Sequence, residues 1–257
     1  MRVTLVPSSI AANGGAEPCQ YLITYLMNET LAIDAGSLGV YGTPAQQALV
    51  KHVLISHTHI DHTASLPIFV ENAYEARSDC VTIHGSAEVL DSLRRDMFND
   101  RIWPDFVALS KGRAPFLKFN RLEPFQPVVL QGLTITPVPV NHVVPTFGFV
   151  VSEVDSTVVI ASDTAPTDDL WRVANNAPGL AAVILEAAFP NGMSELAAIS
   201  KHLTPELFGR EVAKLDRPVT VIAVHLKARY REQIVAELRA LGLPNLEIGT
   251  FGKAYTW

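Results

Sequence analysis

The heptapeptide SHTHIDH occupies residues 56–62. Its candidate ligands are His57, His59, Asp61 and His62. The apolar residues 52–55 before it predict a buried strand, and apolar side chains at helical spacing predict a helix over residues 64–76. The motif is therefore expected in a strand-to-helix turn at the carboxyl edge of a sheet, where ligands gather in α/β proteins. Imidazole nitrogens and carboxylate oxygens suit zinc, manganese or iron, so this turn is predicted to bind metal.

The composition is that of a soluble globular protein. The chain has 257 residues, of which 48% are hydrophobic and 18% charged, enough apolar material for a sizeable core. A formal net charge of −6 argues against a general nucleic-acid or membrane-surface binder. Cys19 and Cys80 form no disulfide framework, so each is predicted to be a small buried hydrophobe in a reducing compartment. The start is a poor signal peptide and no apolar run approaches about 18 residues, so a cytoplasmic location is expected.

The predicted elements run as strands and then helices, twice over, with no linker. In the first half, strands are predicted at 3–6, 20–27, 30–33, 52–55 and 80–84, and helices at 43–50, 64–76 and 86–98. In the second half, strands are predicted at 128–130, 133–140, 147–151, 158–160, 181–185, 219–224 and 246–251, and helices at 168–175, 204–215 and 229–241. This order predicts one α/β (α+β) domain over residues 1–257, a four-layer αββα sandwich.

Residues 99–127 interrupt this order, because Pro104, Pro115 and Pro124 break any regular element. Between residues 94 and 121, seven lysines and arginines stand against three aspartates, a local charge of +4 in an acidic protein. The segment is interpreted as a solvated insertion. The alternative is that it lends cations to an anionic substrate.

Single ligand-type residues follow the apolar strands of the second half. These are His142, Asp163 and His225. A polar residue at one strand end is commonplace, but three of suitable chemistry, together with the histidine turn, predict the remaining ligands of a two-metal site. His52 and His84 lie in strands without such a context and are interpreted as structural.

The HTHIDH motif and the three later residues, in their order and spacing, resemble the metallo-β-lactamase superfamily over nearly the whole chain. The resemblance implies two divalent metal ions, zinc in the first place, with manganese or iron as alternatives. It implies that His57, His59 and His142 hold one ion, that Asp61, His62 and His225 hold the other, and that Asp163 bridges them. Two such ions would hold a hydroxide between them and polarise a phosphoryl or carbonyl group.

Two further stretches resemble the phosphodiesterase branch of this superfamily. EAAFPN at 186–191 with HLTP at 202–205 is similar to class II cyclic-nucleotide phosphodiesterases, and HLKARY at 225–230 is similar to the last motif of ribonuclease Z. The resemblance implies His202 and Glu186 as catalytic residues, alongside the ligand Asp61. The leading interpretation is a phosphodiesterase that hydrolyses a small 3′,5′-cyclic nucleotide through a metal-bridging hydroxide, with His202 as the acid.

Other functions stay open. They are a ribonuclease Z-like tRNA 3′-processing nuclease, another esterase of this fold such as a carbon–phosphorus pathway enzyme, and a metal-binding accessory protein. The charge of −6 and the lack of a glycine-rich arm disfavour a long polyanion as substrate. The expected partner is a small nucleotide, with neither nucleic acid nor membrane, and a homodimer stays open. The base preference and the role of the basic 94–121 segment are not fixed by the sequence.

Overall fold

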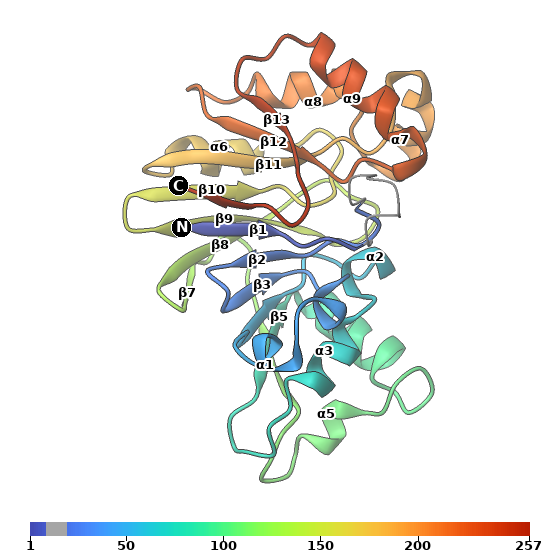
Figure 1. The fold of residues 1–257 in the computed structure, drawn as a ribbon, viewed down its shortest axis with the longest axis vertical. Coiled ribbons are helices and arrows are strands. Elements are labelled where there is room, and N and C mark those ends of the chain that lie inside the picture. The colour runs from blue at the N-terminus through green and yellow to red at the C-terminus, as the bar shows by residue number, and fades with distance from the viewer. Residues whose placement is uncertain (9–19) are drawn as a thin grey trace. The chain divides into compact units, whose positions relative to one another are not determined.

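The computed structural model describes residues 1–8 and 20–257 (Figure 1). The predicted burial of Cys19 concerns a residue outside this described part, and Cys80 is a free thiol that is only partly buried. Every helix in the described part is too short or too polar to cross a membrane. The chain folds as two compact units, each built on a seven-stranded mixed sheet, which confirms the predicted α/β class. One domain over residues 1–257 stays a prediction.

Unit 1 comprises Met1–Glu123 and Phe251–Thr256, and its sheet has the strand order β14-β1-β2-β3-β4-β5-β6. Its strands are β1 (Arg2–Leu5), β2 (Tyr25–Met27), β3 (Leu31–Ile33), β4 (His52–Leu54), β5 (Val81–Gly85), β6 (Leu117–Arg121) and β14 (Ala254–Thr256). Neighbours from β14 to β3 are antiparallel, whereas β3 to β6 run parallel. The carboxyl ends of β3 and β4 are therefore side by side.

Helices cover one face of this sheet. They are the 3₁₀ helix η1 (Leu38–Val40), α1 (Pro44–Gln47), α2 (Ile60–Thr63), α3 (Leu66–Asn72), α4 (Ala87–Ser92), the π-helix η2 (Leu93–Met97) and α5 (Phe106–Leu109). Val53 and Ile83 of the sheet belong to one buried cluster with Phe69 of α3 and Val89 of α4. This packing fixes the position of β4, and hence of the histidine turn that follows it.

Two predictions for unit 1 are wrong in detail. The predicted helix over residues 64–76 is shorter in the structure, because α3 begins at Leu66 and ends at Asn72, with Pro67 in its first turn, where no intrahelical donor is lost. Residues 99–127 are not irregular throughout, since they include α5 and the edge strand β6. In β6, buried Leu117 and exposed Lys118 follow the alternation of a strand, which the flanking prolines conceal in the sequence.

Unit 2 comprises Pro124–Thr250 and Trp257, and its sheet has the strand order β13-β12-β11-β10-β9-β8-β7. Its strands are β7 (Val128–Leu130), β8 (Leu133–Pro139), β9 (Phe147–Glu153), β10 (Ser156–Ile160), β11 (Leu180–Glu186), β12 (Thr220–Val224) and β13 (Leu246–Ile248). Neighbours from β7 to β10 are antiparallel, and β10 to β13 run parallel. The predicted closing strand 246–251 is thus the edge strand β13, and the unpredicted β14 comes after it.

The helices of unit 2 are α6 (Asp169–Asn176), η3 (Asn191–Met193), α7 (Ser194–Ser200), α8 (Pro205–Val212), η4 (Ala228–Tyr230) and α9 (Arg231–Ala240). Trp171 of α6, Phe208 of α8 and Ile234 of α9 share one buried cluster with Leu185 and Val221 of the sheet. The short helix α7 is not predicted by the sequence, because only one of its residues, Ala197, is buried and it shows no apolar stripe.

Candidate metal centre

In unit 1, Asp34 and the histidine turn meet at the carboxyl ends of β3 and β4. Asp34 has a left-handed backbone, with φ of 60°. Its Oδ1 accepts a hydrogen bond from the Ser56 amide at 2.8 Å, and its Oδ2 lies 2.8 Å from the Ser56 hydroxyl and 2.7 Å from Nδ1 of His62. All three side chains are buried, so one carboxylate links the start of the histidine turn to its end.

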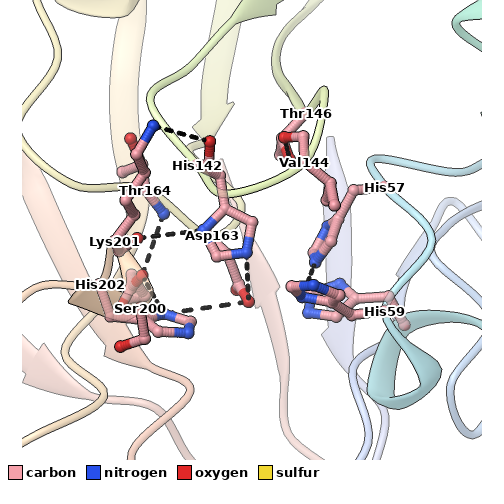
Figure 2. A network of polar contacts seen from close by, with 12 residues as sticks. His57, His59, His142, Val144, Thr146, Asp163, Thr164, Ser200, Lys201 and His202 are labelled. Carbon is pink, nitrogen blue, oxygen red and sulfur yellow. Dashed lines mark hydrogen bonds and ion pairs between the residues drawn. The ribbon is translucent and has the colours of Figure 1, made fainter. Parts of the chain in front are cut away.

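We assign the protons of two imidazole rings from these contacts. His62 donates from Nδ1 to Asp34, so its Nε2 keeps a lone pair. The Ser56 hydroxyl donates to Asp34 and accepts from Nδ1 of His57 at 3.0 Å, so Nε2 of His57 also keeps a lone pair. That atom lies 3.1 Å from Nδ1 of His59 (Figure 2). Two nitrogens bound to one tetrahedral zinc are expected to be about 3.3 Å apart, so the pair has suitable spacing.

The backbone around Asp61 is held closely. Its carbonyl accepts from the Ile23 amide at 2.7 Å, and a Cβ added at Gly36 would lie 2.0 Å from the same oxygen. Only glycine permits this approach of the loop after β3 to α2. The four ligands predicted from the motif therefore lie in one well-anchored turn of unit 1, with His57 and His62 buried and Asp61 partly exposed.

In unit 2, four strands that point in one direction carry predicted residues at their carboxyl ends. Strand β8 is antiparallel to β9, and β9 to β10, so β8 points the same way as β10, β11 and β12. In that order the four strands lead to His142, Asp163, Glu186 and His225. All four side chains are buried. The sheet topology therefore brings them to one edge.

Asp163 lies among three imidazoles of unit 2, of which His142 and His202 are labelled in Figure 2. Its Oδ2 is 3.4 Å from Nε2 of His225, and 4.0 Å from both Nε2 of His142 and Nδ1 of His202. The Lys201 carbonyl accepts from Nδ1 of His142 at 3.0 Å, which leaves Nε2 of His142 with its lone pair. Within unit 2, the ligand atoms of Asp163, Glu186 and His202 lie close enough together that they could hold a metal ion.

Glu186 and His202 form a buried pair at this edge. Oε1 of Glu186 lies 2.7 Å from Nδ1 of His202 and accepts from the Thr164 amide at 3.0 Å. Oε2 accepts from the amides of Ala188 at 3.1 Å and Leu203 at 3.2 Å. The carboxylate thus has four donors, three of them from the backbone, and it orders three loops around itself. The contact between Oε1 of Glu186 and Nδ1 of His202 orients the His202 ring.

Left-handed backbone occurs beside these residues. In the part of unit 2 that is described, Ser162, Lys201 and His225 have φ values of 57°, 54° and 55°. Such non-glycine conformations cost on the order of 1 kcal/mol or more and concentrate at functional sites. Ser162 directly precedes Asp163, and Lys201 directly precedes His202, so this strain falls at predicted positions.

Sequence reasoning missed a further buried carboxylate, Glu211 of α8. Its Oε2 accepts from the indole Nε1 of Trp171 at 2.6 Å and from the Thr167 amide at 3.1 Å. Thr167 lies at the far end of the loop that begins at Asp163, so Glu211 anchors this loop. The burial of Glu211 could have been inferred from the sequence, because it lies three residues after Phe208 on the same face of the helix, and Phe208 is fully buried.

His52 and His84 lie apart from these groups, in β4 and β5. Nδ1 of His84 accepts from the Asn120 amide nitrogen at 3.0 Å, and Nε2 of His84 is 3.0 Å from Nδ1 of His52. Burial lowers the pKa of His84 to about 4, with a further contribution from His52, and burial also lowers the pKa of His52. Both imidazoles are neutral near pH 7 and link strands of the sheet.

Each of the two mixed sheets of this α/β protein carries, at its strand ends, histidine and carboxylate groups that could hold a metal ion. The family described as the beta-lactamase superfamily domain matches residues 36–226. The chain belongs to this superfamily, which confirms the resemblance seen in its motifs.

Curated relatives include nucleotide-directed enzymes. A probable 3′,5′-cyclic-nucleotide phosphodiesterase of Yersinia pestis is 25% identical over 226 residues, covering 78% of this chain and 63% of that protein. A 3′,5′-cyclic-nucleotide phosphodiesterase of Schizosaccharomyces pombe is 35% identical over 94 residues, covering 36% of this chain and 25% of that protein. A ribonuclease Z of Bradyrhizobium diazoefficiens is 34% identical over 104 residues, covering 39% and 32%. The chain thus spans less than two thirds of these relatives.

Solved structures share the fold. The metallo-beta-lactamase fold protein YhfI from Bacillus subtilis has a TM-score of 0.74 at 18% identity, over 99% of this chain and 98% of that one. Unliganded yeast PDE1 has a TM-score of 0.76 at 19% identity, over 98% of each chain. Human tRNase Z, short form, has a TM-score of 0.68 at 15% identity, over 100% of this chain and 99% of that one. The predicted metallo-β-lactamase fold is therefore confirmed.

Proposed function

We propose that this chain is a metal-dependent phosphodiesterase and that its substrate is a small 3′,5′-cyclic nucleotide. The observation that carries the proposal is the buried Glu186–His202 pair, with Asp163 4.0 Å from the same imidazole nitrogen. A histidine held by a carboxylate can donate a proton to a leaving group. The names of the Yersinia pestis and Schizosaccharomyces pombe relatives support a cyclic nucleotide as substrate.

The donor chemistry fits divalent metal ions, because His57, His62 and His142 each engage Nδ1 and leave Nε2 with a lone pair. We take zinc as the first expectation, with manganese and iron as alternatives. The proposed ligands are His57, His59 and His142 for one ion, Asp61, His62 and His225 for a second, and Asp163 for both. When bound, such ions polarise a phosphoryl group and activate water.

The chain's own residues supply the acid. His202 keeps its Nδ1 proton against Glu186, so its Nε2 is the atom that would carry a proton to the departing ribose oxygen. Glu186 holds the ring in one orientation. We assign Asp61 a ligand role in the same site, at the start of α2.

The test combines metal content with substrate choice. Protein made in metal-replete medium is expected to contain close to two equivalents and to hydrolyse cyclic AMP or cyclic GMP. The Asp163→Ala variant is expected to lose more activity than the loss of a single metal ion would cause, because the Asp163 carboxylate is proposed to bind both ions. Protein without metal, and without activity on added zinc or manganese, overturns the proposal. Efficient 3′ processing of pre-tRNA, together with no hydrolysis of cyclic nucleotides, would instead favour the ribonuclease Z function. The name of the Bradyrhizobium diazoefficiens relative supports that alternative.

A further inference from the structure

Lys201 contacts His142 at two separate points, both within unit 2 (Figure 2). Its carbonyl oxygen accepts a hydrogen bond from Nδ1 of His142 at 3.0 Å, and its Nζ donates to the carbonyl oxygen of His142 at 3.2 Å. The first contact fixes the imidazole ring, and the second fixes the backbone that carries it. Together they constrain the direction in which Nε2 of His142 points.

The backbone of Lys201 has a conformation that suits glycine better than lysine. Lys201 is the C-terminal cap of α7, with φ of 54° and ψ of 55°, and its amide donates to the carbonyls of Ala197 and Ala198. The His202 amide donates to the Ala197 carbonyl at 2.9 Å, so the helix ends in a closed turn. Glycine is the common residue in such a left-handed cap, because a side chain is strained there. The contact between Nζ of Lys201 and His142 offsets this strain.

The ammonium group of Lys201 bonds to His142 and to no carboxylate of the described chain. Lys201 is partly buried, and among the residues that the structure describes it forms no ion pair. A hydrogen bond from a charged donor is stronger than one between neutral groups. The bond to the His142 carbonyl is therefore the interaction that holds this side chain in place.

The loop that carries His142 is also joined to the loop that begins at Asp163. The Asn141 amide donates to Oγ1 of Thr164 at 3.2 Å, and the Ala165 amide donates to the Asn141 carbonyl at 2.7 Å. Thr164 and Ala165 directly follow Asp163 in the sequence. The backbone of His142 is thus held from two sides, by the Asp163 loop and by Lys201.

These contacts form a closed cycle of hydrogen bonds. The Thr164 amide donates to Oε1 of Glu186 at 3.0 Å, and the same oxygen lies 2.7 Å from Nδ1 of His202. His202 directly follows Lys201, whose two contacts lead back to His142. A network in which each member has its partners holds its side chains rigidly. Lys201 supplies the contacts that complete this cycle.

We propose that Lys201 is a positioning residue, whose ammonium group holds the metal ligand His142 in a fixed relation to the acid His202. This inference rests on the proposed function, because it takes His142 as a ligand and His202 as the acid. Without the ammonium, the backbone of His142 is free to shift although its ring contact remains, so Nε2 is presented less precisely to a metal ion. Loss of such an outer contact typically lowers metal affinity about 10–100-fold.

Zinc affinity of the full-length protein, measured by competition with a chromophoric chelator, tests the inference without any substrate. Lys201→Gly removes the ammonium but suits the left-handed backbone, and Lys201→Met keeps the length of the side chain without its charge. Both variants are expected to bind zinc at least about tenfold more weakly. Lys201→Arg retains a charged donor and is expected to recover most of the affinity. Lys51→Met is the matched control, because Lys51 pairs only at the surface, with Glu75 and Asp79, and it should leave zinc affinity unchanged.

Stability and kinetics separate positioning from a merely structural role. The urea midpoint of Lys201→Gly is expected to stay close to that of the parent, because glycine relieves the left-handed strain. At saturating zinc, both Lys201→Gly and Lys201→Met are expected to lower kcat for a cyclic nucleotide with little change in KM. Methionine does not loosen the backbone, so equal losses in the two variants trace the effect to the ammonium. Hydrogen exchange at the amides of residues 141–146 in metal-free protein is expected to be faster in Lys201→Met than in the parent.

Parental zinc affinity, kcat and hydrogen exchange in both variants would overturn the inference and leave the phosphodiesterase proposal intact. Losses that follow a fall in the urea midpoint and are not recovered in Lys201→Arg would show a structural role alone, and would overturn it as well. A parent protein that binds no metal would overturn the proposed function together with the ligand role of His142.

Discussion

The imidazole of His202 and the carboxylate of Glu186 are 2.7 Å apart, from Nδ1 to Oε1, and both side chains are buried. This contact leaves Nε2 of His202 as the atom able to serve a leaving group. We expect His202→Ala to lower kcat for a cyclic nucleotide by about 10²–10⁴, the range of general acid catalysis. The loss should shrink for a nitrophenyl phosphodiester, whose leaving group needs little protonation. Steady-state kinetics with both substrates measures the difference.

Metal content is the control for this variant, because His202 is not among the proposed ligands. Loss of metal in the His202→Ala variant would show that His202 is a metal ligand. Equal slowing of both substrates would mean that the residue binds substrate and is not the acid. The Glu186→Gln substitution is expected to lower stability as well as to change the orientation of the His202 ring. Its amide nitrogen would face backbone donors of Ala188 and Leu203 or of Thr164, so stability should fall as well as kcat.

A second prediction concerns Asp34, which is not a proposed ligand but accepts from Nδ1 of His62 at 2.7 Å. In Asp34→Asn, one oxygen is replaced by a donor, so His62 is free to carry its proton on Nε2, the nitrogen needed for the metal. Loss of such an orienting carboxylate typically costs 10–100-fold in metal affinity. Competition for zinc with a chromophoric chelator measures this loss. Asp79→Asn, at an exposed site of the same unit, should show no change.

An Asp34→Asn variant with unchanged zinc affinity would contradict the assigned protonation of the histidine turn. The outcome does not require any substrate, so it tests the metal centre apart from the reaction. Activity restored by excess zinc would further indicate weakened binding and not a lost fold.

The proposed ligand positions stand out in the sequence because most of them follow the end of an apolar strand. Asp163 and His225 follow runs of valine, isoleucine and alanine, and parallel pairing brings such strand ends to one edge. Glu211 could not be predicted with the same ease. On a helix of mixed polarity a glutamate is usually solvated, and only the fold shows that Trp171 faces it.

Strand pairing between residues far apart in the sequence could not be predicted either. Strand β14 pairs with β1 across almost the whole chain, with Val3 opposite Tyr255. Three residues of strand carry little periodicity, so the pairing that makes them a strand is visible only in the structure.

A third prediction follows from the anchoring of the loop after Asp163. Glu211→Ala would leave the Trp171 indole and the Thr167 amide without their acceptor, and would remove a carboxylate 2.8 Å from Lys214. We expect the free energy of unfolding to fall by about 2–4 kcal/mol, since each stranded buried donor costs about 1–3 kcal/mol. Urea denaturation measures it.

Glu206→Ala, on the same helix, is the matched control, because its pair with Arg210 is fully at the surface. Exposed pairs of this kind contribute about 0–1 kcal/mol. Similar losses in the two variants would contradict an anchoring role for Glu211. Trp171→Phe should lie between them, since it removes one donor and leaves the others satisfied.

The last prediction is a pH dependence of stability that originates at His84. Its Nδ1 accepts from Asn120, and its Nε2 donates to Nδ1 of His52, an arrangement that holds only for a neutral ring. Burial and the neighbouring His52 lower its pKa from 6.5 to about 4. Between those values the unfolded chain binds a proton that the folded chain does not, so the free energy of unfolding falls as the pH drops from 6.5 toward 4.

This shift of about two and a half pKa units corresponds to a loss on the order of 3 kcal/mol at the acid end of the window. His84→Gln removes the titration while keeping a neutral hydrogen-bonding side chain. We expect the variant to be less stable than the parent at pH 7.5. Its free energy of unfolding should fall less on acidification, because only the parent has an imidazole at position 84 that takes up a proton. Urea midpoints at pH 7.5, 5.5 and 4.5 measure both slopes. Parallel slopes in the two proteins would show that His84 is not the source.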